Sequence, residues 1–492
     1  MILPYFIIVP LLAAFLIALV PFKREMLAVT VALAAGVLLV PISLYSLFWI
    51  IPAREVYNVG GWAAPYGIVL VLDALSAFML VMVSIIALTS LLFSIRYIRH
   101  ISRDWKYYAL FMLLMAGMNG VIITGDLFNL FVFMEVALLS AISLVAYGGR
   151  AEEFEASFKY AVMGALSSTL ILVGIAFTYS KASTLTMSGI SDALAGDEQG
   201  FVLWVGVLFL AGFGLKAAAM PFHAWLPDAH SSAPAPISSM LSGVFIKALG
   251  IYTLIRIFFT VLGAPQFFMT AFLVLGAVSI IVGVLLAIAQ WDMKRLLAYH
   301  SISQIGYILL GMGLATPLGL LGAVFHLFNH AVFKSLLFYN AGAVEMALGT
   351  RDLRRMGNLS RLLPVTSGTS MVASLSIAGI PPFNGFFSKV IIIIAAVQAG
   401  EPFYAILAVI GSLLTLASFM KVQSYGFRGR REVEAVKAKI GWGMNAAMIS
   451  LAVLCLLSSL LIVPGIREVT LDPVVEVILQ DVNTAGQLVM GR

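Results

Sequence analysis

Three protonatable residues follow one another along a single predicted helix. His326, His330 and Lys334 lie at positions i, i+4 and i+8 of the segment HLFNHAVFK. A helix places residues at this spacing on one face, so the three side chains stack over about 12 Å. A His-x-x-x-His pair could also bind a metal, but the neighbouring sequence supplies no acidic or thiol ligand. A row of proton-carrying groups is therefore the better interpretation.

Three more lysines interrupt strongly apolar sequence, at Lys216, Lys247 and Lys389. A charged side chain near the bilayer centre costs several kcal/mol, so it normally faces protein, a partner or a water-filled path. The alternative is a long stem that carries the ammonium to the membrane surface. Lys247 lies about 16 Å into its predicted helix, too deep for that. Lys389 is similarly buried, whereas depth alone leaves Lys216 undecided.

Glu135 is the natural anionic counterpart of these lysines. It lies about eight residues into the predicted helix DLFNLFVFMEVALLS, roughly 12 Å deep at the helical rise. Its sequence neighbours offer no basic residue within a helical turn. A membrane glutamate of this kind must be neutral or paired with a cation from another helix.

Other charged or polar positions lie close to predicted helix ends. Asp73 and Asp126 are predicted to be helix caps or interfacial groups, and Arg256 is predicted to be an interfacial anchor. Glu345 is open to either interpretation. Residues 300–304, HSISQ, give one predicted helix a polar start, which helix capping could explain.

Two predicted helices contain residues that break helices. Proline removes a backbone hydrogen bond, and the freed groups are tolerated at membrane depth only where protein or water satisfies them. Two interrupted helices in the two halves of a chain indicate an inverted-repeat transporter. Each break adjoins a buried lysine, and a break near Pro221 would keep Lys216 near mid-depth. The residues concerned are Pro221, Pro227, Pro234 and Pro236 in the first helix, and Gly379, Pro381, Pro382 and Gly385 in the second.

The composition requires a membrane around these residues. The chain has 492 residues, 62% of them hydrophobic and only 11% charged, with a mean hydropathy of +1.05. In soluble domains about a quarter of all residues are charged, so this is a polytopic membrane protein. The run 2–20 lacks the flanks of a cleaved signal and is predicted to be a retained span. A lone cysteine, Cys455, cannot ligate an iron–sulfur cluster, so no redox centre is expected in this chain.

About fourteen membrane helices follow from the spacing of Gly, Pro and charge clusters. Lys and Arg should collect in loops on the cytoplasmic side. The loops after odd-numbered helices hold twenty of these residues and the opposite loops four. Both termini are therefore predicted to lie outside, and the net charge of +6 marks a membrane face and not a nucleic-acid surface. The helices are predicted near 2–21, 26–50, 71–95, 107–124, 127–148, 155–180, 201–230, 236–259, 262–289, 296–313, 318–348, 362–398, 403–424 and 442–464.

The motifs together resemble a known family. GFGLKAAAMPFHAWLPDAHSSAPAPISSMLSGVFIKALGIY, SIAGIPPFNGFFSK and the His/His/Lys row are similar to the antiporter-like subunits of complex I, Mrp Na⁺/H⁺ antiporters and membrane-bound hydrogenases or sulfur reductases. The segment TGDLFNLFVFMEVALLS and the loop DLRRMGNLSRLLP (352–364) look most like the Mrp D-type subunit and its hydrogenase counterpart. The resemblance implies an all-α membrane protein with fourteen core helices. It further implies inverted repeats of helices 4–8 and 9–13, and hence divisions at 1–106, 107–259, 260–439 and 440–492.

The resemblance also implies the roles of individual residues. Glu135 matches the glutamate of helix 5 that pairs with the helix 7 lysine, here Lys216. Lys247 matches the central lysine of helix 8, and Lys389 matches the lysine of an exit half-channel. The row of residues at 326, 330 and 334 matches the polar axis that connects them. The expected function is translocation of protons, or Na⁺/H⁺ antiport, through this axis.

Several questions stay open at the level of sequence. The expected partners are further antiporter-like and small Mrp-type membrane subunits, H⁺ or Na⁺ and the lipid bilayer, with no nucleic acid. Cofactors are expected only in partner subunits, so the chain could belong to an oxidoreductase complex without being its redox enzyme. The alternative assignment is a proton-pumping subunit of complex I, and a passive scaffold is the rival from another class. The expected location is the plasma membrane of a prokaryote.

Overall fold

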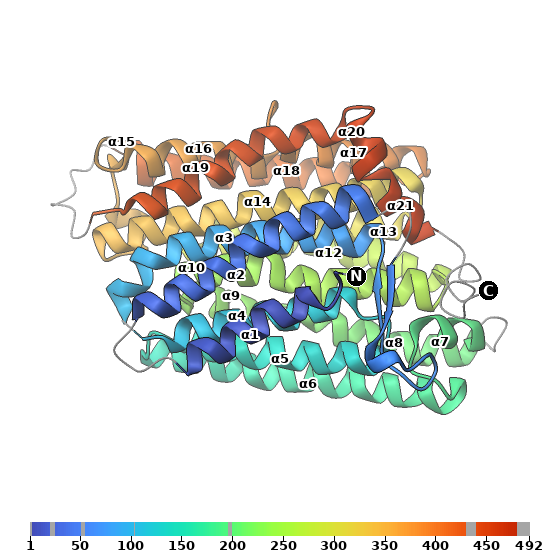
Figure 1. The fold of residues 1–492 in the computed structure, drawn as a ribbon. Coiled ribbons are helices and arrows are strands. Elements are labelled where there is room, and N and C mark those ends of the chain that lie inside the picture. The colour runs from blue at the N-terminus through green and yellow to red at the C-terminus, as the bar shows by residue number, and fades with distance from the viewer. Residues whose placement is uncertain are drawn as a thin grey trace.

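Every segment predicted to cross the membrane has a helical counterpart in the computed structural model, and the helices pack side by side as one bundle (Figure 1). The structure describes residues 2–19, 25–50, 55–102, 104–194, 199–429 and 439–479. Within these ranges, eleven helices are long and apolar enough to cross a membrane. Eight basic residues used in the topology prediction lie outside the described ranges: Lys23, Arg24, Arg54, Arg103, Arg430, Arg431, Lys437 and Arg492.

The N-terminal part adds a small hairpin that the sequence did not predict. Its elements are α1 (Tyr5–Ala18), α2 (Glu25–Tyr45), η1 (Ser46–Ile50), β1 (Glu55–Asn58), η3 (Val59–Gly61), β2 (Val69–Leu72) and α3 (Ala74–Ile101). Strands β1 and β2 pair antiparallel, with Glu55 opposite Leu72. The helix predicted from residue 71 therefore begins only at Ala74, because residues 71 and 72 belong to β2.

The middle of the chain contains the first interrupted helix. Its elements are α4 (Lys106–Ile123), α5 (Leu127–Val145), α6 (Ala151–Ala182), α7 (Met187–Leu194), α8 (Gln199–Ala217), α9 (Trp225–Ser232), α10 (Ala235–Met240), η4 (Leu241–Phe245), η5 (Lys247–Tyr252), α11 (Thr253–Ile255) and η6 (Arg256–Val261). From α10 to η6 the chain forms one continuous helix, Ala235–Val261, with several π-helical turns.

The last part of the described chain contains the second interrupted helix. Its elements are α12 (Gln266–Ala289), α13 (Met293–Gly313), α14 (Pro317–Leu348), η7 (Leu353–Arg355), α15 (Leu359–Leu362), α16 (Pro364–Ala378), α17 (Asn384–Gln398), α18 (Pro402–Val422), η8 (Gln423–Phe427), α19 (Trp442–Leu457), η9 (Ser458–Ile462), α20 (Ile466–Thr470) and α21 (Asp472–Leu479).

Both predicted breaks are present. Helix α8 ends at Ala217 and the chain turns through residues 218–224 before α9 begins. Helix α16 is terminated by Gly379, which adopts a φ of +79°, and α17 begins at Asn384. The second break needs glycine at residue 385 as well, because a Cβ there would collide with the carbonyl oxygen of Ser376. The prediction of two interrupted helices is confirmed.

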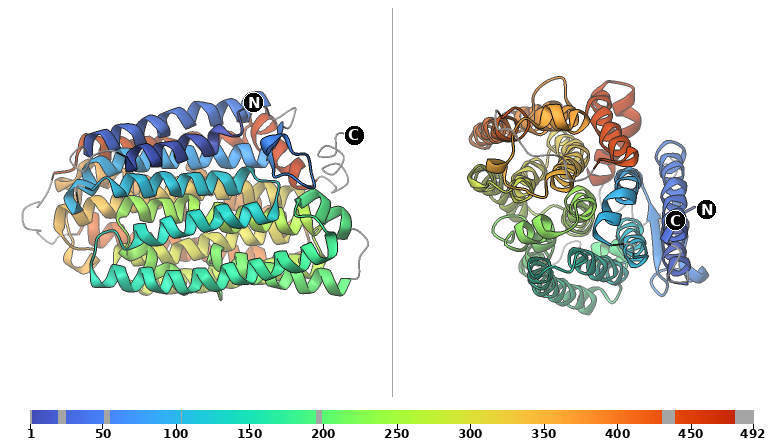
Figure 2. Two further views of the ribbon diagram at one scale, coloured as in Figure 1. Left: turned by 60° about the horizontal axis from the view of Figure 1, so that its bottom comes forward. Right: turned by 90° about the vertical axis from the view of Figure 1, so that its left-hand side faces the viewer.

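The centre of the bundle is formed by α14 and the helix 235–261, as the end-on view shows (Figure 2). In the most apolar 18-residue stretch of α14, 100% of the residues are buried, and in that of the helix 235–261, 94% are buried. In the corresponding stretches of the helices that begin with α18 and α19, only 33% of the residues are buried, as expected of helices that face lipid or another subunit. The central elements are also those that carry Lys247 and the row from His326 to Lys334.

Aspartates cap several helices. Asp73 forms a capping box with Ser76 at the start of α3, and the carboxylate of Asp126 accepts from a backbone N–H in the first turn of α5. These two predicted caps are confirmed. Helix α13, however, begins at Met293 with Asp292 as its cap, so His300 lies two turns inside the helix. Capping therefore does not explain the polar residues 300–304.

Candidate functional site

Glu135 and Lys216 meet between helices α5 and α8, as predicted. The Lys216 Nζ lies 3.7 Å from the Glu135 Oε1. The lysine side chain is 2% exposed, while the carboxylate is 29% exposed on the outer surface of the bundle. Ser168 of α6 stands between them: its Oγ accepts a hydrogen bond from Lys216 at 3.0 Å and donates one to Glu135. The pair is thus linked through a third side chain that the sequence analysis did not single out.

Two side chains and two backbone hydrogen bonds satisfy polar groups at the break between α8 and α9. The Trp225 indole N–H donates to the carbonyl of Leu215 at 2.9 Å, and the Met220 N–H donates to the Ser279 hydroxyl at 3.0 Å. These bonds allow α8 to stop inside the protein, since a freed backbone group at membrane depth must find a protein or water partner. Lys216 is therefore held near the break, and its polar partners are side chains and not freed carbonyls.

Lys247 lies at the start of a π-helical run in the central helix and is fully buried. Its ammonium donates to the backbone carbonyl of Ser242, one turn earlier. The Ser242 hydroxyl is hydrogen-bonded to Ser301 of α13 at 2.7 Å. The lysine thus takes a backbone carbonyl of its own helix as its partner, in a part of the helix that contains π-helical turns.

The row along α14 is buried throughout, and each of its members is 0% exposed. The His326 Nδ1 is 2.9 Å from the Ser388 hydroxyl of α17, and the rings of His326 and His330 are stacked with centroids 6.3 Å apart. Lys334 donates to the carbonyl of Leu297. Both ring nitrogens of His330 are without a hydrogen-bond partner in the described part of the chain. The predicted face of stacked protonatable groups is confirmed as geometry.

Lys389 lies in α17 just after the second break. Its Nζ donates to the carbonyl of Ile377 at 2.7 Å and is 3.4 Å from the Ser412 hydroxyl. The ammonium also lies over the ring of Tyr307, 4.7 Å from its centroid. Since Ile377 is in the last turn of α16, the lysine caps the broken helix. Here the freed carbonyl and the buried cation satisfy each other.

Arg256 does not anchor the chain at a membrane surface, so that prediction is wrong. Its guanidinium is 9% exposed and forms an ion pair with Asp73, with 2.6 Å between Nη2 and Oδ1. It also donates to the hydroxyl of Tyr252 and lies over that ring. Burial alone would raise the pKa of the Asp73 carboxyl, but Arg256 lowers it below its ordinary value. The pair ties the start of α3 to the central helix.

Glu345, which the sequence left open, forms a second largely buried ion pair. Its Oε2 is 2.7 Å from the Nζ of Lys294, a lysine in the first turn of α13 that is 2% exposed. Lys294 also donates to the carbonyl of Ala233 at 3.2 Å, and Tyr97 of α3 donates to Glu345 at 3.3 Å. The pair therefore joins the chain beyond α9 to the ends of three other helices.

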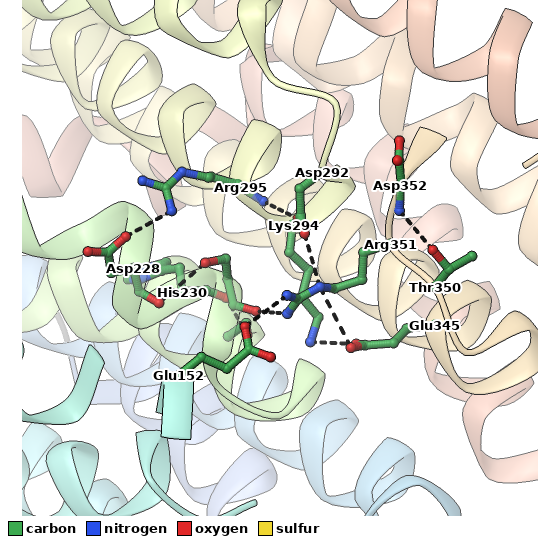
Figure 3. A network of polar contacts seen from close by, with 12 residues as sticks. Glu152, Asp228, His230, Asp292, Lys294, Arg295, Glu345, Thr350, Arg351 and Asp352 are labelled. Carbon is green, nitrogen blue, oxygen red and sulfur yellow. Dashed lines mark hydrogen bonds and ion pairs between the residues drawn. The ribbon is translucent and has the colours of Figure 1, made fainter. Parts of the chain in front are cut away.

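More charged groups gather around α9 (Figure 3). Arg351 donates to the carbonyl of Ser231 at 2.6 Å and pairs with Asp292 at 3.0 Å. Asp228 of α9 pairs with Arg295 at 2.9 Å. Carbonyls at the end of a helix carry partial negative charge, so cations stabilise this end of α9. Lys294 and Arg351 also line a cavity of about 130 Å³ here. We call the end of the bundle that holds this cavity the basic end.

These observations define a class: polytopic helical membrane proteins with two broken helices and a row of buried protonatable side chains. Residues 124–415 match the family model described as NADH:quinone oxidoreductase/Mrp antiporter, TM, and the chain belongs to this family. Residues 59–112 match the model described as NADH-Ubiquinone oxidoreductase (complex I), chain 5 N-terminus.

Individual relatives agree with this assignment. The chain is 38% identical over 390 residues to the D-type subunit of the Na(+)/H(+) antiporter of Alkalihalophilus pseudofirmus, a match that covers 78% of this chain and 79% of the relative. It superimposes on a chain of the Mrp complex from Dietzia sp. with a TM-score of 0.91 and 30% identity, covering 100% and 99% of the two chains. A chain of the archaeal membrane-bound sulfane sulfur reductase gives 0.87 and 28%, with 99% of each chain covered.

Proposed function

We propose that this chain moves H⁺ or Na⁺ through the membrane by way of Glu135, Lys216, Lys247, the α14 row and Lys389. The observation that carries the proposal is the burial of these cations. Lys216 is 2% exposed and Lys247 is 0% exposed, in helices that can cross a membrane, and Lys389 is 2% exposed in the shorter apolar helix α17. Burying charges without good compensation destabilises a protein, so their presence at mid-depth is best explained by transport. Histidine nitrogens that lack partners within the described ranges offer stations for protons between the lysines.

The pair of Glu135 and Lys216 would start the movement. An ionised carboxylate beside the lysine stabilises the ammonium, whereas a buried ammonium that loses its counter-charge is unstable. Separation of the pair would therefore drive the proton of Lys216 toward Lys247. Energy for the separation would come from a neighbouring subunit or from an opposing ion gradient.

We further propose that the two broken helices mark two inverted repeats, over residues 107–259 and 260–439. Helices α8 and α9 and helices α16 and α17 provide one interrupted helix in each range, and each has a lysine beside the break. The region 1–106 and the region from 440 onward would then be additions around the two repeats. In this arrangement each half supplies one half-channel, joined at mid-depth by the α14 row.

A partner subunit is proposed to cover the outer face of α5. Glu135 shares that face with Phe128, Val132 and Leu139, which are 45%, 42% and 63% exposed. A carboxylate that faced lipid at this depth would be costly. A neighbouring membrane subunit with a cationic or hydrogen-bonding group would satisfy it, as would be expected in an assembly with further antiporter-like and small Mrp-type subunits.

We propose that the basic end faces the cytoplasm of a prokaryote and that both termini lie outside. Arg150, just before α6, borders the same cavity as Arg351, and so do His100 and Ile101 at the end of α3, whose last turn also holds Arg99. This is the side favoured by the excess of basic residues in cytoplasmic loops. Membership of an Mrp-type antiporter, or of a hydrogenase or sulfur reductase built from such subunits, is supported by the likeness to the relatives above.

The decisive experiment is ion transport by the intact complex in proteoliposomes, followed with a pH-sensitive dye. Lys216→Ala and Glu135→Ala should abolish transport while the subunits still assemble. Lys159→Ala is the matched control, because this lysine is 48% exposed and pairs with Asp228 away from the buried row. Full transport by the Lys216 or Glu135 variant would refute the proposal. If Lys247→Leu were also fully active, the chain would be a passive scaffold.

A further inference from the structure

Ser168 occupies a position that the ion pair alone does not explain. The 3.7 Å between Lys216 and Glu135 is longer than the 2.7–3.2 Å typical of an N–H···O hydrogen bond. The Ser168 hydroxyl is within hydrogen-bond distance of both, accepting from the ammonium at 3.0 Å and donating to the carboxylate. The residue is 6% exposed. The hydroxyl is thus the hydrogen-bonded link between two charged groups that do not bond directly.

We propose that Ser168 is a positioning and relay residue through which the proton passes between Lys216 and Glu135. The inference rests on the proposed function. In the step, the Nζ–H bond of the lysine breaks as a new Oγ–H bond forms on the serine. The original Oγ–H proton moves at the same time to Oε1 of the glutamate. The charged pair becomes a neutral amine and a neutral carboxylic acid, and the serine is unchanged.

This step suits the surroundings of the pair. In a low-dielectric site a neutral pair can approach the stability of an ion pair, because neither member then needs solvation of its charge. Run in reverse, the same step moves a proton from the glutamic acid through the serine to the neutral lysine and restores the charged pair. Ser168 would therefore reload Lys216 from Glu135 after the lysine has passed its own proton toward Lys247.

The neighbouring residues identify a matched control. Ser167 is the adjacent residue of α6 and is also buried, but its hydroxyl donates to the carbonyl of Gly212 at 2.7 Å. That bond holds α6 against α8 and does not involve the ion pair. The hydroxyl of Tyr160, also on α6, makes no hydrogen bond within the described ranges, so it offers no second link between the two charges.

The test compares Ser168→Ala, Ser168→Thr and Ser167→Ala in the intact complex, with initial transport rates measured in proteoliposomes across a range of pH. Ser168→Ala should lower the rate about tenfold or more, the factor expected for the loss of one hydrogen bond to a charged group. Its pH profile should also change, because the hydrogen-bonded path for the proton between the two side chains is lost. Ser168→Thr keeps the hydroxyl and should restore both rate and profile to near the wild type.

The controls separate this inference from the proposed function. Ser167→Ala should reduce stability or assembly, while each assembled complex keeps the wild-type pH profile. An unchanged rate and profile for Ser168→Ala, with Lys216→Ala inactive, would overturn the relay and leave the transport function standing. Should Ser168→Ala fail to assemble, Ser168→Cys decides the matter, since a thiol has nearly the same shape but is a weak hydrogen-bond partner. Equal rates for the threonine and cysteine variants would refute the relay.

Discussion

The buried pair of Asp73 and Arg256 allows a stability prediction that separates its two contributions. Asp73 both caps α3, through Ser76, and compensates the Arg256 guanidinium at 2.6 Å. Removing one partner of a buried ion pair costs about 3–5 kcal/mol, and removing an N-cap side chain costs about 1 kcal/mol. Asp73→Ala should therefore destabilise the protein by about 4–6 kcal/mol. Asp73→Asn, which keeps a capping oxygen but not the charge, should cost about 1 kcal/mol less.

The measurement is thermal unfolding of the purified complex in detergent, with Asp73→Asn/Arg256→Met as the compensated control. Replacing both charges by uncharged residues leaves no unpaired ion, so the double variant should be more stable than Asp73→Asn alone. Because the folded-state pKa of Asp73 is lowered, the stability it contributes is present at pH values above its unfolded pKa of 3.8. That stability is lost as the pH falls below this value. An Asp73→Asn variant as stable as the wild type would refute the reasoning.

Three shorter predictions concern the ends and breaks of the helices. Lys294→Met leaves the Glu345 carboxylate without its partner at 2.7 Å and should destabilise the protein by about 3 kcal/mol. Its unfolding temperature should therefore be lower than that of the double variant Lys294→Met/Glu345→Gln. Gly385→Ala should prevent correct assembly, because its Cβ would collide with a backbone carbonyl at the end of α16; normal assembly on size-exclusion chromatography would contradict this. Trp225→Phe should cost about 1 kcal/mol through the lost hydrogen bond to a carbonyl of α8, and an unchanged unfolding temperature would argue against it.

Much of the architecture was predictable because its signals are local. Apolar runs long enough for the bilayer indicate the helices, and proline with glycine marks the two breaks near residues 221 and 381. The spacing of His326, His330 and Lys334 places them on one face of any helix, whatever packs against it. The errors are equally local. The sequence does not predict the hairpin of β1 and β2, because residues 69–72, VLVL, are as apolar as the helix that follows.

The roles of isolated charges were less predictable. Arg256 lies near a helix end, and sequence position alone cannot distinguish a surface anchor from a buried pair. Its partner, Asp73, lies 183 residues away in the sequence. Lys294 falls in the loop between the predicted helices 262–289 and 296–313, and only the structure places it in α13 against Glu345. An aspartate, glutamate or lysine close to a helix end is compatible with a cap, a surface group or an ion pair, and only the neighbouring helices decide between them.

The sequence by itself determined that this chain crosses the membrane many times, carries cations that cannot reach water, and interrupts two helices beside them. Hydropathy, burial cost and proline geometry act over a few residues, so they can be read without a fold. Apart from the predicted partner of Lys216, the tertiary structure alone decided which groups compensate those charges: Ser168 and backbone carbonyls. Ser168 could not be distinguished from the many other serines of the chain, because its contact with Lys216 spans 48 residues and requires α5, α6 and α8 to pack together. That packing places the Ser168 hydroxyl between the predicted pair of Glu135 and Lys216.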